Sequence, residues 1–172
     1  ANAGDLKIDS KRISICGDSA GGNLSAAVTL LCRERNGPKL WRQVLIYPAV
    51  DALLSIDHSP YESIRTNAHA PILPSSLTLS FWQHYLNNDS DATNIYASPI
   101  QADLQNVPPA LVITAEYDSI RDEGEAYAAR LQDHNIPAKV IQYKGLVHGF
   151  LTLPLPINQQ VHETIALFLH DS

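Results

Sequence analysis

Three residues of this chain, a serine, an aspartate and a histidine, have types and positions that could carry out nucleophilic chemistry together. Ser19 is the centre of the segment Gly17-Asp18-Ser19-Ala20-Gly21, which has the pattern Gly-x-Ser-x-Gly. In a sharp turn between a strand and a helix, this pattern exposes the serine hydroxyl for attack on an acyl carbon. We expect Gly17 and Gly21 to be glycines because so tight a turn leaves no room for side chains beside the serine.

The residues around Ser19 favour this interpretation over a glycine-rich turn that merely packs a strand against a helix. Arg12 to Cys16 is typical of a buried strand, and apolar residues repeat at helical spacing from Ala20 to Arg35. A strand that runs into a helix through Gly-x-Ser-x-Gly is the setting of a nucleophile elbow. The backbone N–H of Ala20, directly after the serine, is then a candidate donor to an oxyanion.

A serine hydroxyl is a weak nucleophile at neutral pH, so Ser19 needs a histidine base that a carboxylate holds in the right tautomer. His148 follows the predicted strand Lys139 to Tyr143, at the carboxyl end where sites assemble in parallel sheets. Taken alone, His148 could be an incidental loop histidine; with the elbow present, it is the predicted base. The other six histidines lie in the long excursion or on predicted helices: His58, His69, His84, His134, His162 and His170.

Asp118 is the predicted carboxylate, because it leaves the carboxyl end of the predicted strand Ala110 to Ala115. Two alternatives stay open: Asp118 could instead cap the following helix, or Asp122 could be the acid and Asp118 the cap. Strand-end geometry favours Asp118, since Asp122 already belongs to the helical pattern. Asp18 could act as an auxiliary acid, but local hydrogen bonding at the elbow is the interpretation we favour.

The elements that must position these residues alternate along the chain. Strands are predicted at residues 12–16, 43–47, 110–115 and 139–143, and helices at 20–35, 75–86, 123–134 and 157–169. This alternation predicts an α/β fold with a parallel sheet of about four strands covered by helices on both faces. The excursion from Asp51 to Pro109 is too long for a mere connection and is interpreted as a lid or pocket wall.

Composition narrows the class of protein and its partners. The 172 residues are 45% hydrophobic and 17% charged with a net charge of −6, which suits one globular domain and argues against nucleic acid as a partner. There is no stretch of eighteen apolar residues and no signal-peptide pattern at the beginning. A cytoplasmic location is therefore expected, with a secretion signal upstream of Ala1 left open. Cys16 and Cys32 are interpreted as buried thiols in preference to a disulfide.

Several of these segments together resemble the hormone-sensitive lipase family of α/β-hydrolases, of the bacterial carboxylesterase type. The resemblance runs from about Ile8 to the end of the chain and is carried by five ordered motifs: G-D-S-A-G-G-N, Y-P, Y-A-S-P, E-Y-D-S-I-R-D-E-G-E-A-Y-A and V-H-G-F. It implies Ser19 as nucleophile, Asp118 as acid and His148 as general base, in the chain order typical of nucleophile-elbow enzymes. Ser119 stands where the family usually has proline, which is a mild departure.

The resemblance further implies hydrolysis of carboxylic esters with short to medium acyl chains, with no metal or organic cofactor. It implies one catalytic domain over residues 1–172, in which the excursion from about residue 53 to 91 contributes to a cap over the acyl pocket. Two other functions stay open: a small-molecule receptor on the same fold, and an amidase or peptidase. His148 argues against the receptor, since the receptors that resemble this family have lost the histidine.

The resemblance covers only the C-terminal half of such an enzyme. No His-Gly-Gly-Gly type loop, which supplies oxyanion donors in the family, is found in this sequence. Loss of a single oxyanion donor lowers turnover by about 10²- to 10³-fold. We expect an upstream half to exist, the strand ending at Cys16 to be an exposed edge, and the 172 residues alone to be poorly active and prone to oligomerise. A soluble monomer with full esterase turnover would contradict this.

Overall fold

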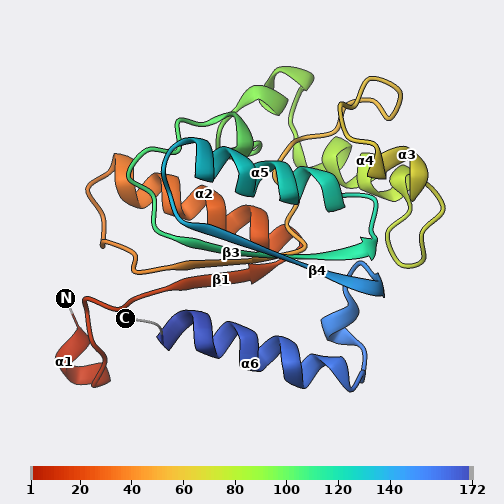
Figure 1. Cartoon of the computed structure of the whole chain (residues 1–172). Coiled ribbons are helices and arrows are strands. Elements are labelled where there is room, and N and C mark those ends of the chain that lie inside the picture. The colour runs from red at the N-terminus through yellow and green to blue at the C-terminus, as the bar shows by residue number, and fades with distance from the viewer. Residues whose placement is uncertain (1, 171–172) are drawn as a thin grey trace.

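A four-stranded parallel sheet is the centre of the computed structural model, which describes residues 2–170 (Figure 1). The strands lie side by side in chain order: β1 (Ile15–Asp18), β2 (Gln43–Ile46), β3 (Ala110–Tyr117) and β4 (Ala138–Val147). Every neighbouring pair is parallel. The predicted α/β class and its parallel sheet of about four strands are confirmed.

Helices cover both faces of this sheet (Figure 1). α2 (Ala20–Glu34) and α5 (Arg121–Asp133) lie on one face, and α6 (Ile157–His170) lies on the other. All four residues of β2 are buried because the strand has neighbours on both sides and helices on both faces, whereas β1 alternates between half-buried and exposed positions. Within the described residues β1 pairs only with β2, so it is the edge that the sequence predicts.

Two hydrophobic clusters fill the space on either side of the sheet. The first lies beneath α2 and α5 and includes Leu30, Val112 and Tyr127. The second lies beneath α6 and includes Ile113 and Phe150. Val112 and Ile113 are consecutive residues of β3 in different clusters, because side chains of a strand point alternately to its two faces.

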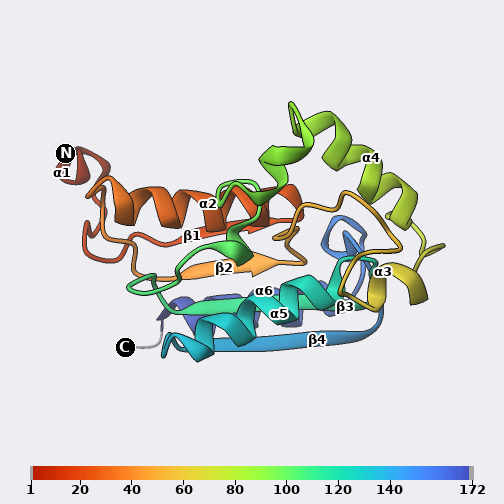
Figure 2. The same cartoon turned by 90° about the horizontal axis from the view of Figure 1, so that it is seen from above.

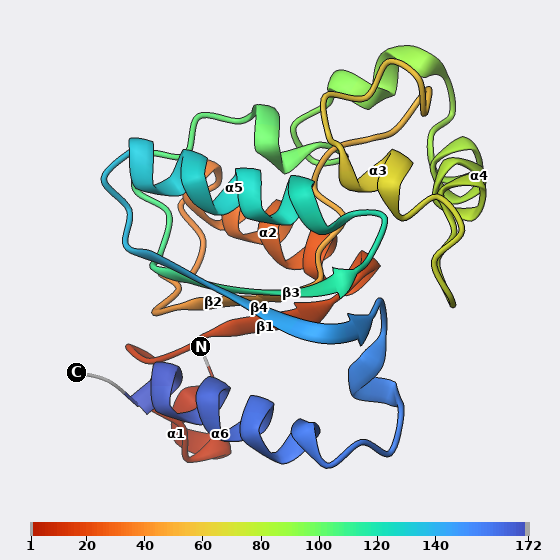
Figure 3. The same cartoon turned by 45° about the vertical axis from the view of Figure 1, so that its right-hand side comes forward.

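The excursion between β2 and β3 forms its own small unit. It contains α3 (Ser63–Thr66), α4 (Ser75–Tyr85) and two short 3-10 helices, Asp89–Thr93 and Pro99–Gln101. α3 and α4 lie at the end of the molecule toward which the strands run (Figures 2 and 3). A third cluster that includes Leu53, Ile64, Trp82 and Ala97 gives this unit a core. The remaining helices are α1 (Ala3–Leu6) and the 3-10 turn Phe150–Thr152.

The structure corrects two details of the sequence prediction. The first strand is Ile15–Asp18 and not residues 12–16, because an edge strand extends only where its partner does, and β2 pairs with it from Gln43 to Ile46. The cysteines are free, as predicted, but Cys16 is exposed and Cys32 is only half-buried. The edge position of β1 explains the exposure of Cys16.

Within residues 2–170, no helix is long and apolar enough to cross a bilayer. Residues 1, 171 and 172 of the predicted 1–172 domain lie outside the described range.

Candidate active site

Ser19 occupies a strained turn between β1 and α2. Its backbone φ is 54° and its ψ is −119°, a region that residues with side chains rarely adopt. Two glycines near Ser19 have no room for a side chain. A Cβ added at Gly17 would overlap the Gly21 carbonyl, and a Cβ added at Gly22 would lie 2.7 Å from Pro48. A Cβ at Gly21 would meet nothing closer than 3.8 Å, so the second glycine that this turn requires is Gly22 and not Gly21.

The three predicted site residues meet at the carboxyl ends of the strands. The Ser19 Oγ lies 2.8 Å from His148 Nε2, and His148 Nδ1 lies 2.7 Å from the Asp118 Oδ2. Asp118 is fully buried and His148 is 5% exposed. With its proton on Nδ1, where the carboxylate accepts it, the imidazole has Nε2 free to accept the serine proton. The structure thus brings together all three side chains from positions far apart in the sequence.

Asp118 and Asp122 have separate environments. Besides His148, Asp118 accepts a hydrogen bond from the Ile120 backbone N–H at 3.0 Å, which closes the turn before α5. Ile120 is the N-cap of α5 and this helix has no side-chain cap hydrogen bond, so the structure does not give Asp118 the capping role. Asp122 lies in the first turn of α5 and accepts from the Ser63 N–H at 2.7 Å and from the Arg121 guanidinium at 2.8 Å. The oxygens of Asp122 are therefore engaged away from the imidazole.

The beginning of α2 offers backbone donors beside the hydroxyl. The first N–H groups of a helix have no partner within it. Here the Ser19 carbonyl accepts from the N–H groups of Gly22 and Asn23, at 3.0 and 3.2 Å. No acceptor within residues 2–170 takes the N–H of Ala20, the predicted oxyanion donor.

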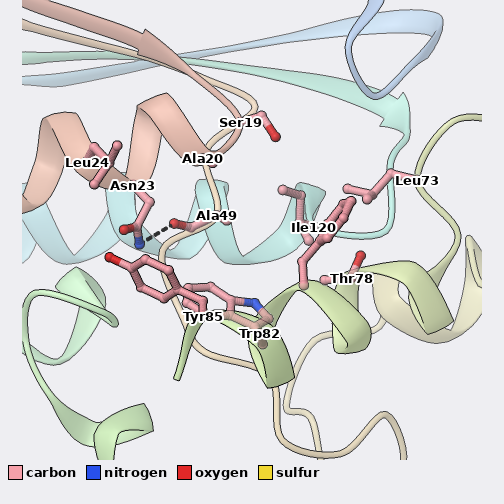
Figure 4. Close-up of a pocket in the computed structure, with 11 residues that line it drawn as sticks. Ser19, Ala20, Asn23, Leu24, Ala49, Leu73, Thr78, Trp82, Tyr85 and Ile120 are labelled. Atoms are coloured by element: carbon pink, nitrogen blue, oxygen red, sulfur yellow. Dashed lines mark hydrogen bonds between the residues drawn. The ribbon is translucent and has the colours of Figure 1, made fainter. Parts of the chain in front are cut away.

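An apolar cavity of about 360 Å³ opens at Ser19 (Figure 4). Figure 4 shows α4 forming the wall across from the nucleophile turn, with Thr78, Trp82 and Tyr85 toward the cavity. Asn23 fastens α2 to this region, since its amide donates to the carbonyls of Ala49 and Ala97 at 2.8 and 2.7 Å. The other lining residues are mostly apolar: Ala20, Leu24, Ala49, Leu73, Phe81 and Ile120.

Two residues close to the site were not predicted as functional. Glu123, in the first turn of α5, is 4% exposed and accepts from the Val50 N–H at 2.8 Å. Tyr47, at the end of β2, packs its ring against His148. Both lie in segments that carry the resemblance, but only three-dimensional contact relates them to the site.

Burial raises the pKa of Glu123 well above its ordinary value, and the nearby charges of Asp51 and Asp118 raise that pKa further. The native state therefore holds the Glu123 proton more tightly than the unfolded chain does. The stability gained from this proton is complete below the unfolded pKa of about 4.3 and is lost as pH rises through the native pKa. A neutral Glu123 also spares the site a second negative charge near Asp118.

Glu123→Gln should remove this pH dependence, because the amide is neutral and keeps an oxygen for the Val50 N–H. We expect the wild-type protein to lose stability relative to the variant by about 1 kcal/mol per pH unit above pH 5, until the native pKa is reached. Thermal unfolding of both intact proteins between pH 5 and 8 measures the difference. Parallel stability curves would show that Glu123 ionises in the native state as it does in the unfolded chain.

A parallel sheet with a strand-turn-helix serine, a histidine and an aspartate in contact at its carboxyl edge defines the class of α/β proteins built around a nucleophile elbow. Comparison with known proteins agrees with this class. The chain belongs to the alpha/beta hydrolase fold family, whose model matches residues 1–152.

The matched relatives include named esterases, which confirms the resemblance to the hormone-sensitive lipase type. An arylesterase of Saccharolobus solfataricus is 40% identical over 172 residues, covering 99% of this chain and 54% of that protein. The carboxylesterase NlhH of Mycobacterium tuberculosis is 38% identical over 160 residues, covering 91% of this chain and 49% of that protein. The solved structure of a hyperthermophilic esterase from Pyrobaculum calidifontis superposes with a TM-score of 0.91 at 41% identity, covering 98% of this chain and 55% of that one. The chain thus spans about half the length of these relatives.

Proposed function

We propose that the protein containing this chain hydrolyses carboxylic esters by acyl transfer through Ser19. The observation that carries the proposal is the unbroken hydrogen-bonded series from the Ser19 hydroxyl through the His148 ring to the Asp118 carboxylate, at 2.8 and 2.7 Å. Similarity to esterases in both sequence and structure supports the same reaction.

In the proposed mechanism, His148 Nε2 accepts the hydroxyl proton as Ser19 Oγ attacks the ester carbonyl. Asp118 stabilises the imidazolium that forms, and the free N–H of Ala20 donates to the developing oxyanion. The imidazolium then protonates the leaving alcohol, and a water molecule, activated by the same histidine, releases the acid from the acyl-serine. Each proton passes between His148 and an oxygen atom, so the residues present suffice for proton transfer.

A second oxyanion donor is part of this proposal. Ala20 supplies one N–H group, and the relatives that the chain resembles are about twice as long as the chain. We propose that the further donor comes from sequence outside these 172 residues. Removal of one such donor costs about 10²- to 10³-fold in kcat, which sets the activity expected of the 172 residues alone.

The cavity beside Ser19 supports a short to medium acyl chain as the bound group. Its volume of about 360 Å³ lies near the lower end of the range for small-molecule pockets, roughly 300 to 1,000 Å³. Leu73, Phe81 and Trp82 come from the 53–91 segment and line this cavity, which supports the proposal that the segment acts as a cap within a single catalytic domain.

Phe81→Ala tests the cavity as the acyl site. Phe81 is 58% exposed, so its removal should leave the fold intact while taking away roughly 50 Å² of apolar contact, or about 1.3 kcal/mol. We expect kcat/KM for p-nitrophenyl octanoate to fall about tenfold and that for the acetate to change less than twofold. Gln83→Ala, an exposed change on the same helix outside the cavity lining, is the control. Equal losses for both esters would place the acyl chain elsewhere.

Covalent labelling tests the proposed reaction directly. A fluorophosphonate should label the intact protein at Ser19, as peptide mass spectrometry would show, and p-nitrophenyl esters should be cleaved far faster than the matching anilides. Anilide cleavage at a comparable rate would point to an amidase. A folded intact protein that is neither labelled nor active would point to a receptor.

A further inference from the structure

Building on this proposed function, we propose that Tyr47 is a positioning residue whose ring fixes the tilt of the His148 imidazole. Tyr47 lies directly after β2, between the strand that delivers Ser19 and the strand that precedes Asp118. We do not propose that Tyr47 touches the reacting atoms. It affects the reaction by orienting the His148 ring.

The two hydrogen bonds of His148 leave one motion of its ring unrestrained. The N–H and the lone pair of an imidazole lie in the ring plane, and His148 uses one at Nδ1 and the other at Nε2. A ring held at these two atoms can still rock about the line that joins them, which would swing the lone pair of Nε2 away from the serine proton. A rigid group packed against the ring opposes this rocking.

Tyr47 supplies that contact. The centroids of the Tyr47 and His148 rings are 4.9 Å apart with an angle of 59° between their planes, within the range of favourable aromatic pairs. Phe150 packs edge-on against Tyr47 at 5.6 Å and is fully buried. The imidazole is therefore backed by two aromatic rings in series. Tyr47 itself is 1% exposed and cannot move aside into solvent.

The backbone at Tyr47 is strained in order to place the ring there. Its φ is 35°, although a bulky side chain strongly disfavours positive φ and the following Pro48 disfavours helical conformations at the residue before it. The Tyr47 N–H donates to the Ile113 carbonyl at 2.6 Å, which holds the strand end. Strain of this kind persists where the surroundings dictate it, and such places cluster at functional sites.

Pro48 shows how the surroundings dictate this turn. It sits between the first turns of α2 and α5, where an added Cβ would lie 2.7 Å from Pro48 at Gly22 and 3.3 Å from it at Gly124. The absence of side chains at both glycines allows the proline to wedge between the two helices. The wedge fixes the turn that aims the Tyr47 ring at His148.

The ring and not the hydroxyl accounts for this role. The Tyr47 hydroxyl is buried beside Asp18 and makes no hydrogen bond of normal geometry within the described residues. Phenylalanine would present the same ring to the imidazole. Leucine would fill much of the space but would lack the flat face.

Steady-state kinetics of the intact protein on a p-nitrophenyl ester test the proposal. We expect Tyr47→Leu to lower kcat by about 10- to 100-fold with KM changed less than threefold, since displacing a catalytic group by about 1 Å can cost 10²-fold. Tyr47→Phe should keep kcat within threefold. Tyr127→Leu is the matched control. Tyr127 is also a fully buried tyrosine, in the cluster under α5, and its hydroxyl has no hydrogen-bond partner among the residues that the structure describes.

A folded Tyr47→Leu protein with wild-type kcat would overturn the proposal, as would a loss confined to KM or one matched by Tyr127→Leu. If Tyr47→Leu does not fold, Tyr47→Phe decides, because a loss above tenfold in that variant would assign the role to the hydroxyl instead. Circular dichroism and thermal unfolding establish which variants are folded.

Proton NMR gives a readout that does not depend on ester hydrolysis. The proton between His148 Nδ1 and Asp118 should give a downfield resonance that is missing in Asp118→Asn. We expect it to exchange with water at least tenfold faster in Tyr47→Leu and at the wild-type rate in Tyr47→Phe and Tyr127→Leu. Unchanged exchange in Tyr47→Leu would overturn the positioning role. A wild-type protein that hydrolyses no ester but shows the expected exchange pattern would overturn only the esterase proposal.

Discussion

Ser19→Ala is expected to lower kcat for ester hydrolysis by about 10⁴- to 10⁶-fold while KM changes less than threefold. The change removes the hydroxyl that we propose as the nucleophile, whereas the cavity and the free N–H of Ala20 stay in place. The small residual rate would come from binding and oxyanion stabilisation alone. Initial rates with a p-nitrophenyl ester, measured on the intact protein, determine both constants.

Two further measurements make the Ser19→Ala result specific. Fluorophosphonate labelling should disappear in Ser19→Ala and persist in Ser76→Ala, a change at an exposed serine of α4. The structure predicts little loss of stability, because within residues 2–170 the Ser19 side chain makes a single hydrogen bond, the one to His148. A Ser19→Ala protein that keeps a tenth of the wild-type kcat would exclude Ser19 as the nucleophile.

Most of the fold could be predicted because its signals are local. The alternation of apolar strands with helical patterns predicts a parallel sheet, and the glycines around Ser19 mark a turn within six residues of sequence. The errors arise where a segment distant in the sequence determines the bounds of an element or the exposure of a side chain. The start of β1 depends on where β2 pairs with it, and Cys16 is exposed because β1 lies at the edge of the sheet.

The candidate site shows the same division. Strand-end position correctly indicates which edge of the sheet Asp118 and His148 share, because parallel strands all end at that edge. Contacts between side chains of different strands could not be predicted in this way. That Tyr47 backs the imidazole depends on a positive φ and on a proline wedged between two helices, and a single sequence carries no signal for either. The burial of Glu123 likewise depends on the path of the excursion.

The second large effect is a loss of kcat that distinguishes between Asp118 and Asp122, the two carboxylates that the sequence left as alternatives for the acid. Asp118→Asn is expected to lower kcat about 10⁴-fold. The asparagine oxygen can still accept from the Ile120 N–H, so the turn before α5 should survive and the fold with it. Its NH₂ group then faces His148 Nδ1, which must give up its proton to accept this donor. The proton moves to Nε2, the nitrogen that should receive the serine proton, so the histidine is held in the wrong tautomer.

Asp122→Asn is the matched control, since it makes the same chemical change four residues further along. Asp122 bonds to the Ser63 N–H and to Arg121, so its replacement should lower stability modestly, by about 1 kcal/mol, and leave kcat within threefold. Kinetics and thermal unfolding of the two variants side by side would show opposite patterns. If Asp122→Asn lost the larger part of kcat, the acid would be Asp122, and the 2.7 Å contact between Asp118 and His148 would serve only to hold the loop.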